Sequence, residues 1–256
     1  MGGRASIAAL LAAATLMQPA ASARAADVVD LPVSFAVQNT NTSAVPCPSD
    51  GRAYTVRGHL TAPASAFAAP GAVAVYLTGL ETGEWNWRLT AVPGYDWPVE
   101  MARAGETSLT LDLLGYGQSG HPPGYASCYG SQADVVHQVV ADLRAGRYRA
   151  PTATPPRFDR VVLVGHDVGG AFAAIATDRL RVRDIHVPVL LAIGADDKIF
   201  TQDGWAQQRE LYAGSRDVTA LSLAATGHYP MLERAAPRFR ALVAGWLDRS
   251  GFGASR

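Results

Sequence analysis

Short apolar runs alternate along the chain with segments whose apolar residues recur at helical spacing. The continuous apolar run 161–164 precedes a small-residue helix expected over 169–180, and a second apolar run follows at 187–193. Strands that are covered on both faces of a parallel sheet have such unbroken runs. The same reasoning predicts strands at 33–37, 54–60, 72–77, 108–113 and 218–223, and helices at 97–104, 132–143 and 231–247.

The order of these elements indicates the fold class. Strands that alternate with helices imply a mostly parallel sheet flanked by helices, the α/β class. The first two strands are separated only by the turn-rich segment 46–51, which predicts an antiparallel N-terminal edge. No internal repeat or linker interrupts residues 26–256, so we expect one domain there.

The N-terminal residues have the pattern of an export signal. Arg4 precedes the apolar run 7–17, and Ala23-Arg24-Ala25 fits a small-x-small cleavage site. The run is too short to span a bilayer. We therefore predict a signal peptide over 1–25 and a secreted or periplasmic protein without a stable membrane anchor. The alternative is a disordered, alanine-rich tail.

Composition and charge narrow the possible partners. The chain is 48% hydrophobic and has 22 basic and 22 acidic residues, a formal net charge of zero. It has no basic cluster interleaved with aromatic residues, so neither nucleic acid nor an anionic membrane is expected as a partner. In an oxidising compartment the two cysteines, Cys47 and Cys128, are expected to form a disulfide. The alternative is two unrelated buried thiols.

The segment 165–169, Gly-His-Asp-Val-Gly, carries the strongest chemical signal. It connects a buried strand to a small-residue helix, with glycines two positions before and two after Asp167. This is the pattern of a nucleophile elbow, a strained turn that holds one side chain above the sheet. By itself, Asp167 could instead be an ordinary helix N-cap.

With three further motifs in the same order, the chain resembles the α/β-hydrolase superfamily. Residues 112–120 resemble its loop after the strand preceding the elbow, Gly194-Ala195-Asp196-Asp197 its acid loop, and Gly227-His228 its histidine loop. The resemblance implies an α/β-hydrolase fold over 26–256 and a triad of Asp167 as nucleophile, His228 as base and Asp197 as acid. Asp196 competes as the acid, and His228 could be an ordinary loop histidine. His166 is expected to point into the sheet as a structural residue.

Aspartate at the elbow resembles the epoxide hydrolases and haloalkane dehalogenases, in which a carboxylate attacks an sp3 carbon. The resulting alkyl ester would be hydrolysed by water that His228 activates. By position, the backbone N–H groups of Leu80 and Val168 would form the oxyanion hole. Trp85, Trp87 and Tyr95 could donate a hydrogen bond to the leaving group, or they could simply pack.

Some features depart from the Asp-nucleophile families. Val168 replaces their usual tryptophan, and Thr78 replaces the usual histidine of the oxyanion turn. Only residues 181–186 separate the helix after the elbow from the next strand, which leaves no room for another strand or a cap domain. The strand at 187–193 is therefore expected directly beside the strand at 161–164. The rest of the chain resembles secreted bacterial α/β hydrolases with a serine nucleophile.

Three functions follow from these features. The first is a hydrolase that uses Asp167 on an epoxide, an alkyl halide or another activated sp3 carbon of a small hydrophobic substrate. The second is an esterase-like or lipase-like hydrolase with an altered nucleophile and weak activity. The third is an inactive binding protein on the same fold. No cofactor is implied, because no dinucleotide fingerprint or metal-ligand spacing is found. The sequence leaves the substrate and the oligomeric state open.

Overall fold

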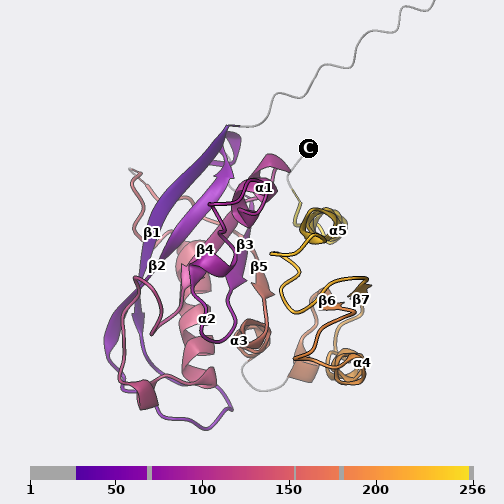
Figure 1. The fold of residues 1–256 in the computed structure, drawn as a ribbon. Helices are drawn as coiled ribbons and strands as arrows, with labels where there is room; N and C mark the ends of the chain where they lie inside the picture. The colour runs from indigo at the N-terminus through magenta and orange to yellow at the C-terminus, as the bar shows by residue number, and fades with distance from the viewer. Residues whose placement is uncertain (1–26, 68–70, 153, 179–181, 254–256) are drawn as a thin grey trace, which may run out of the picture.

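The strands of the computed structural model form two separate sheets (Figure 1). The structure describes residues 27–67, 71–152, 154–178 and 182–253, so the predicted signal peptide lies outside it. The larger sheet has the order β1-β2-β4-β3-β5, and the smaller one pairs β6 with β7. The strands are β1 (Val28–Gln38), β2 (Ala53–Pro63), β3 (Ala72–Leu77), β4 (Ser108–Asp112), β5 (Arg160–Gly165), β6 (Val189–Gly194) and β7 (Val218–Leu223).

Helices follow most of the strands, as the alternation of patterns predicts. β1 and β2 form the antiparallel edge, whereas β3 is parallel to both β4 and β5. The fold class and the antiparallel N-terminal edge are therefore confirmed. The helices are α1 (Trp97–Arg103), α2 (Tyr129–Ala145), α3 (Val168–Thr177), α4 (Gln202–Leu211) and α5 (Ala236–Arg249), with short 3-10 turns η1 (Ala64–Phe67), η2 (Glu84–Asn86), η3 (Gly124–Ala126) and η4 (Val182–Asp184).

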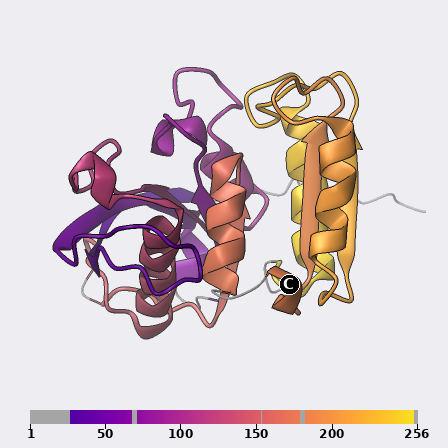
Figure 2. The same ribbon diagram turned by 90° about the horizontal axis from the view of Figure 1, so that it is seen from below.

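The burial of strand β3, which lies between β4 and β5, explains its continuous apolar run. Its residues Val73, Val75 and Leu77 belong to the core that α2 and α3 cover. Ala74 and Tyr76 point to the opposite face and join a second core with residues of α1 and α5. Successive side chains of a strand point to opposite faces, so a strand buried on both sides must be apolar throughout. Figure 2 shows α2 and α3 lying together against the larger sheet.

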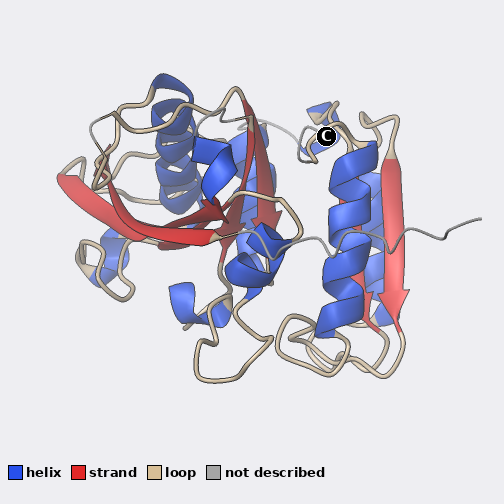
Figure 3. Cartoon of the chain, turned by 90° about the horizontal axis from the view of Figure 1, so that it is seen from above, coloured by secondary structure: helices blue, strands red, loops and turns tan. Residues whose placement is uncertain are grey.

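The expectation that the strand after the elbow helix lies beside the elbow strand is wrong. β6 pairs in parallel with β7, and β5 pairs with β3. Figure 3 shows the two sheets side by side but separate. Val162 and Val164 of β5 and Leu190 of β6 are partly buried, and each packs against the second core. No cap is inserted between α3 and β6 in the described residues 154–178 and 182–253.

Two helices differ from the sequence-based expectation. α4 was not predicted, because its polar sequence QDGWAQQREL has no apolar stripe. Its start does carry a local signal, since the hydroxyl of Thr201 accepts a hydrogen bond from the N–H of Gly204 at 3.1 Å. The last helix begins at Ala236 rather than at 231, with a proline in its first turn. Proline favours the first turn of a helix, where its missing N–H is not needed.

The disulfide is confirmed, since Cys47 and Cys128 are joined across 81 positions of sequence. It connects the loop between β1 and β2 to the residue that caps α2. None of the described helices is both long and apolar enough to cross a membrane. The bridge is compatible with an oxidising compartment.

Candidate active site

The turn between β5 and α3 has the strained geometry of a nucleophile elbow. Asp167 has φ 55° and ψ −126°, a conformation that non-glycine residues rarely adopt. The glycines on either side are required by close packing. A Cβ on Gly165 would lie 2.2 Å from the carbonyl carbon of Gly169, and one on Gly169 would lie 2.6 Å from the oxygen of Leu77. The strand and helix can therefore pass closely only because both positions are glycine.

The side chain of Asp167 does not act as a helix cap. It makes no capping hydrogen bond to α3, although Asp167 is the residue that precedes the helix. Its Oδ2 instead accepts a hydrogen bond from the backbone N–H of Leu80 at 3.1 Å. The structure thus brings the predicted nucleophile against one of the predicted oxyanion donors. Val168 begins α3, so its N–H belongs to the first helical turn, where intrahelical partners are missing.

Hydrogen bonds within the loop after β3 hold Leu80 in place. The hydroxyl of Thr78 donates to the carbonyl of Thr82 at 3.0 Å, and the hydroxyl of Thr82 donates to the carbonyl of Gly79 at 3.1 Å. Thr78, which stands where the resemblance would place histidine, thus closes the turn on itself. The Asp167 carboxylate packs against Gly79, where an added Cβ would lie 2.8 Å from Oδ2.

Asp112 anchors the same loop from the end of β4. It is buried, and its carboxylate accepts hydrogen bonds from the backbone N–H groups of Glu84 at 2.8 Å and Gln118 at 2.9 Å. In the sequence, Asp112 is only the first residue of the segment 112–120, which resembles the loop before the elbow. Gly83 and Gly117 pack directly against the Asp112 carboxylate, where a Cβ on either would collide with it. These two glycines are the sequence signal that could have indicated the contact.

The predicted base and acid meet on the smaller sheet. Nδ1 of His228 lies 3.0 Å from Oδ2 of Asp197, and both side chains are nearly buried. The other oxygen of Asp197 accepts hydrogen bonds from the N–H groups of Ile199 at 2.8 Å and Phe200 at 3.0 Å. Asp196 is exposed and uses its backbone N–H to bind the carbonyl of Thr226. Of the two candidate acids, Asp197 is the one against the histidine.

These contacts decide the charge of Asp197. Burial acts to raise the pKa of this carboxyl, but the hydrogen bonds from His228, Phe200 and Ile199 outweigh it and lower the pKa below its ordinary value. Asp197 is therefore a carboxylate at neutral pH. A carboxylate at Nδ1 fixes the tautomer in which Nε2 of His228 is free to accept a proton.

His166 does not simply point into the sheet. It is 8% exposed, and its Nε2 lies 2.8 Å from the backbone oxygen of His228. Its ring lies 4.8 Å from the ring of His228 and 4.8 Å from the ring of Tyr229, measured between centroids. The residue before the nucleophile is therefore in direct contact with the histidine loop.

The predicted leaving-group donors occupy different environments. Trp87 is buried, and its indole N–H donates to the carbonyl of Leu77 at 3.3 Å, so this group is already used in the core. Trp85 is 56% exposed on η2, next to the oxyanion turn. Tyr95 is partly buried in the loop before α1. Trp85 and Tyr95 remain the candidates for this role.

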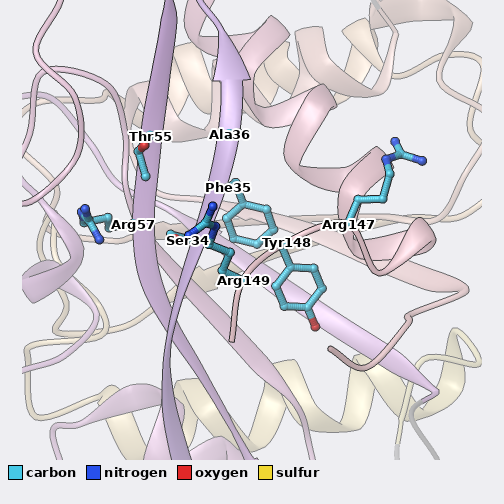
Figure 4. A pocket seen from close by; sticks show the side chains of 8 residues that line it. All are labelled: Ser34, Phe35, Ala36, Thr55, Arg57, Arg147, Tyr148 and Arg149. Carbon is cyan, nitrogen blue, oxygen red and sulfur yellow. The ribbon is translucent and has the colours of Figure 1, made fainter. Parts of the chain in front are cut away.

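A surface hollow of about 500 Å³ lies elsewhere, against β1 and β2. Its lining includes Arg57, Arg147 and Arg149, but Figure 4 shows Arg57 and Arg147 directed to opposite sides. Arg147 is also paired with Asp142, with Nη2 and Oδ1 3.0 Å apart. The hollow lies at the edge of the sheet opposite β5, so it is not part of the candidate active site.

The comparisons with known proteins concern the fold. No protein-family model matches the chain, and no curated protein matches it. Solved structures do match, among them an esterase of Pyrococcus furiosus with a TM-score of 0.61, 12% identity and coverage of 88% of this chain and 91% of that chain. The chain has the α/β-hydrolase fold.

Two further matches have the same fold. A CIB-like hydrolase of Thermoplasma acidophilum has a TM-score of 0.58 and 14% identity, covering 84% of this chain and 100% of its own. Dienelactone hydrolase of Anabaena variabilis has a TM-score of 0.55 and 14% identity, covering 85% and 98%. In this α/β-hydrolase fold, Asp167, Asp197 and His228 follow β5, β6 and β7, where the resemblance places nucleophile, acid and base. In the described residues, no three His, Cys, Asp or Glu side chains are grouped as metal ligands.

Proposed function

We propose that this protein is an exported hydrolase that opens an activated sp3 carbon, such as that of an epoxide, through an ester of Asp167. The observation that carries the proposal is the hydrogen bond from the N–H of Leu80 to Oδ2 of Asp167. It holds one carboxylate oxygen in the position where negative charge develops during ester hydrolysis. The other oxygen, Oδ1, is then the attacking atom.

In the first step, Oδ1 of Asp167 forms a bond to a ring carbon of the epoxide. The carbon–oxygen bond of the ring breaks, and its electron pair leaves with the oxygen, which takes a proton from solvent. The indole N–H of Trp85 or the hydroxyl of Tyr95 would donate a hydrogen bond to this oxygen. With an alkyl halide, the halide leaves instead. Attack on an ester carbonyl would give an anhydride, an unfavourable product, so the carboxylate nucleophile favours sp3 carbon.

In the second step, Nε2 of His228 takes a proton from water, and the water oxygen adds to Cγ of Asp167. The carbonyl electron pair moves to Oδ2, where the N–H groups of Leu80 and Val168 stabilise the oxyanion. The bond from Cγ to Oδ1 then breaks, and the departing alkoxide takes the proton from His228. Asp197 orients His228 and stabilises its imidazolium form while it carries the proton.

The residues around the triad support a small hydrophobic substrate. Leu80 is 53% exposed and Phe200 46% exposed, although both are large and apolar. The backbone N–H of Leu80 binds Asp167, and the ring of Phe200 lies 5.5 Å from the ring of His228, so both residues border the proposed triad. Apolar groups exposed next to polar catalytic residues are typical of ligand sites. The disulfide supports a secreted or periplasmic location.

Intact-protein mass on the His228→Phe variant tests the proposal. Without its base, the variant should keep the ester after incubation with styrene oxide or, separately, with 1-bromobutane. The expected result is an added mass that maps to Asp167, and the Asp167→Asn variant is the control that should show none. Absence of an adduct with both compounds would refute the proposal.

A second candidate is a carboxylic-ester hydrolase in which serine has been replaced. The elbow conformation of Asp167 favours it, because the same strained turn presents a serine nucleophile. Asp167→Ser tests this candidate with p-nitrophenyl butyrate. Ester hydrolysis by the variant, absent in the double variant with His228→Phe, would support it. An inactive Asp167→Ser protein that is folded would count against it.

A further inference from the structure

The two halves of the candidate site stand on different sheets. Asp167 follows β5 of the larger sheet, whereas Asp197 and His228 follow β6 and β7 of the smaller one. β5 and β6 are not paired in the described structure, so no strand ladder fixes the distance between nucleophile and base. Side-chain contacts must therefore set their relative position.

His166 makes contacts with three of the loops that form the site. Its chain position ties it to Asp167, and its backbone N–H donates to the carbonyl of Leu77 at 3.1 Å. Nε2 lies 2.8 Å from the backbone oxygen of His228. Nδ1 lies 3.5 Å from the amide nitrogen of Asn86, in the loop that carries the oxyanion turn. One side chain thus links the elbow, the histidine loop and the oxyanion loop.

The partners of His166 define its protonation. A backbone carbonyl can only accept a hydrogen bond, so Nε2 must carry the proton. Nδ1 is then free to accept from the amide of Asn86. Burial lowers the pKa of His166, although the hydrogen bond to the backbone oxygen of His228 and the carboxylates of Asp167 and Asp197 oppose the shift. A neutral ring with one donor and one acceptor satisfies both neighbours.

We infer that His166 is a positioning residue, which holds the main chain of His228 and the oxyanion loop in register with Asp167. The inference rests on the proposed function, because the step it serves is water activation by His228. Attack by Asp167 does not use His228, whereas hydrolysis needs His228 at a fixed distance from Cγ of Asp167. Loss of His166 should therefore impair the second step and spare the first.

Two substitutions separate hydrogen bonding from packing. His166→Phe keeps an aromatic ring beside His228 and Tyr229 but removes both nitrogen atoms. His166→Gln supplies a side-chain N–H that can reach the carbonyl of His228. His137→Phe is the matched control, because His137 lies on the exposed side of α2. Thermal unfolding of all three variants establishes that each is folded.

Single-turnover kinetics with styrene oxide measure the two steps by mass. In His166→Phe, we expect adduct formation on Asp167 within about twofold of wild type and adduct breakdown slower by roughly tenfold or more, the factor lost with one buried hydrogen bond. His166→Gln should recover part of the breakdown rate. Equal losses in both steps, or an unchanged breakdown rate, would overturn the inference.

Imidazole NMR tests the inference without requiring activity. In the wild-type protein, long-range ¹H–¹⁵N spectra should show His166 as the neutral ring with its proton on Nε2. His166→Phe should shift and broaden the imidazole signals of His228, and His166→Gln should restore them, while His137→Phe should not change them. Unchanged His228 signals in His166→Phe would overturn the inference. If these signals respond but wild type and His228→Phe form no adduct, the proposed function fails and the positioning role stands.

Discussion

Asp167 and Leu80 are 87 positions apart in the chain, yet Oδ2 of the aspartate accepts the backbone N–H of the leucine at 3.1 Å. This contact joins the ends of β3 and β5, which are neighbouring parallel strands. The contact depends on the lack of a side chain at Gly79, where a Cβ would meet the carboxylate. An aspartate at the elbow is therefore accommodated by the turn opposite it, in addition to its own flanking glycines.

Gly79→Ala should displace the Asp167 carboxylate from Leu80. The added methyl would lie 2.8 Å from Oδ2 and 2.9 Å from Cβ of Asp167, so one of the groups must move. We expect ester hydrolysis slower by about 10²-fold, the order of effect seen when an oxyanion donor is lost. Gly124→Ala is the control, because a Cβ there meets no atom within 4 Å. Equal rates in the two variants would contradict the role of this contact.

Asp197→Asn should remove the carboxylate that orients His228. The amide would no longer favour the tautomer with the proton on Nδ1, so Nε2 would be a poorer base. Breakdown of the Asp167 adduct should slow by about 10²- to 10⁴-fold, as measured by mass in single turnover. Asp196→Asn is the matched control, since its side chain is exposed. A similar loss in Asp196→Asn would mean that the assignment of the acid is wrong.

The elbow conformation at Asp167 could be predicted from the sequence, because close backbone packing requires glycine at Gly165 and Gly169 and leaves a local signature. The contact between Asp197 and His228 was also expected from the motifs. Asp197 could be preferred over Asp196 by motif spacing alone. The separation of β5 from β6 could not be predicted, because it depends on how the two sheets pack in three dimensions. Such packing involves residues distant in sequence and leaves no local pattern.

The contacts of His166 could not be predicted from the sequence either. A histidine before a nucleophile can point in several directions, and its direction here is set by the carbonyl of His228, which belongs to another loop.

The helix α4 could not be predicted for a different reason. Its residues are mostly exposed, so burial imposes no apolar periodicity on them.

His59 should make stability depend on pH. Its Nδ1 lies 2.7 Å from Oε1 of Glu84, and this hydrogen bond raises the pKa of His59, although burial opposes the shift. A histidine whose pKa is raised in the folded state stabilises the protein while it is protonated. This stabilisation is fully present below the unfolded pKa of about 6.5 and is lost as pH rises through the folded pKa. His59→Gln should therefore lower the free energy of unfolding more at pH 5.5 than at pH 9.

Urea unfolding at the two pH values measures this difference. Arg88 also pairs with Glu84, with Nη1 and Oε1 3.2 Å apart, and with Asp30, with Nη2 and Oδ2 2.6 Å apart. Glu84 therefore keeps a cationic partner in the variant. The variant is therefore expected to fold at both pH values. His121→Gln, at an exposed loop position, provides the control. A larger effect of His59→Gln at pH 9 than at pH 5.5 would refute the prediction.

Replacing both cysteines should destabilise the fold and leave the triad unaffected. The bridge between Cys47 and Cys128 closes a loop of 81 positions. In the chain-entropy model, such a loop contributes about 4.5 kcal/mol by restricting the unfolded chain. The double variant Cys47→Ser, Cys128→Ser should unfold at lower urea concentration, while adduct formation on Asp167 at low temperature stays unchanged. No shift in the urea midpoint would show that the bridge adds nothing to stability.

Isotope labelling should follow the oxygen of the attacking water. If water adds to Cγ of Asp167, its oxygen stays on the aspartate after the first turnover, and Oδ1 leaves in the product. A single turnover of styrene oxide in H₂¹⁸O should therefore put ¹⁸O into the peptide that contains Asp167 and leave the first product unlabelled. A His228-assisted attack of water directly on the epoxide would give the reverse pattern, with labelled diol and an unlabelled peptide. Because both routes use the same triad and give the same diol, the position of the label decides whether Asp167 acts as a nucleophile or only as a neighbouring charge.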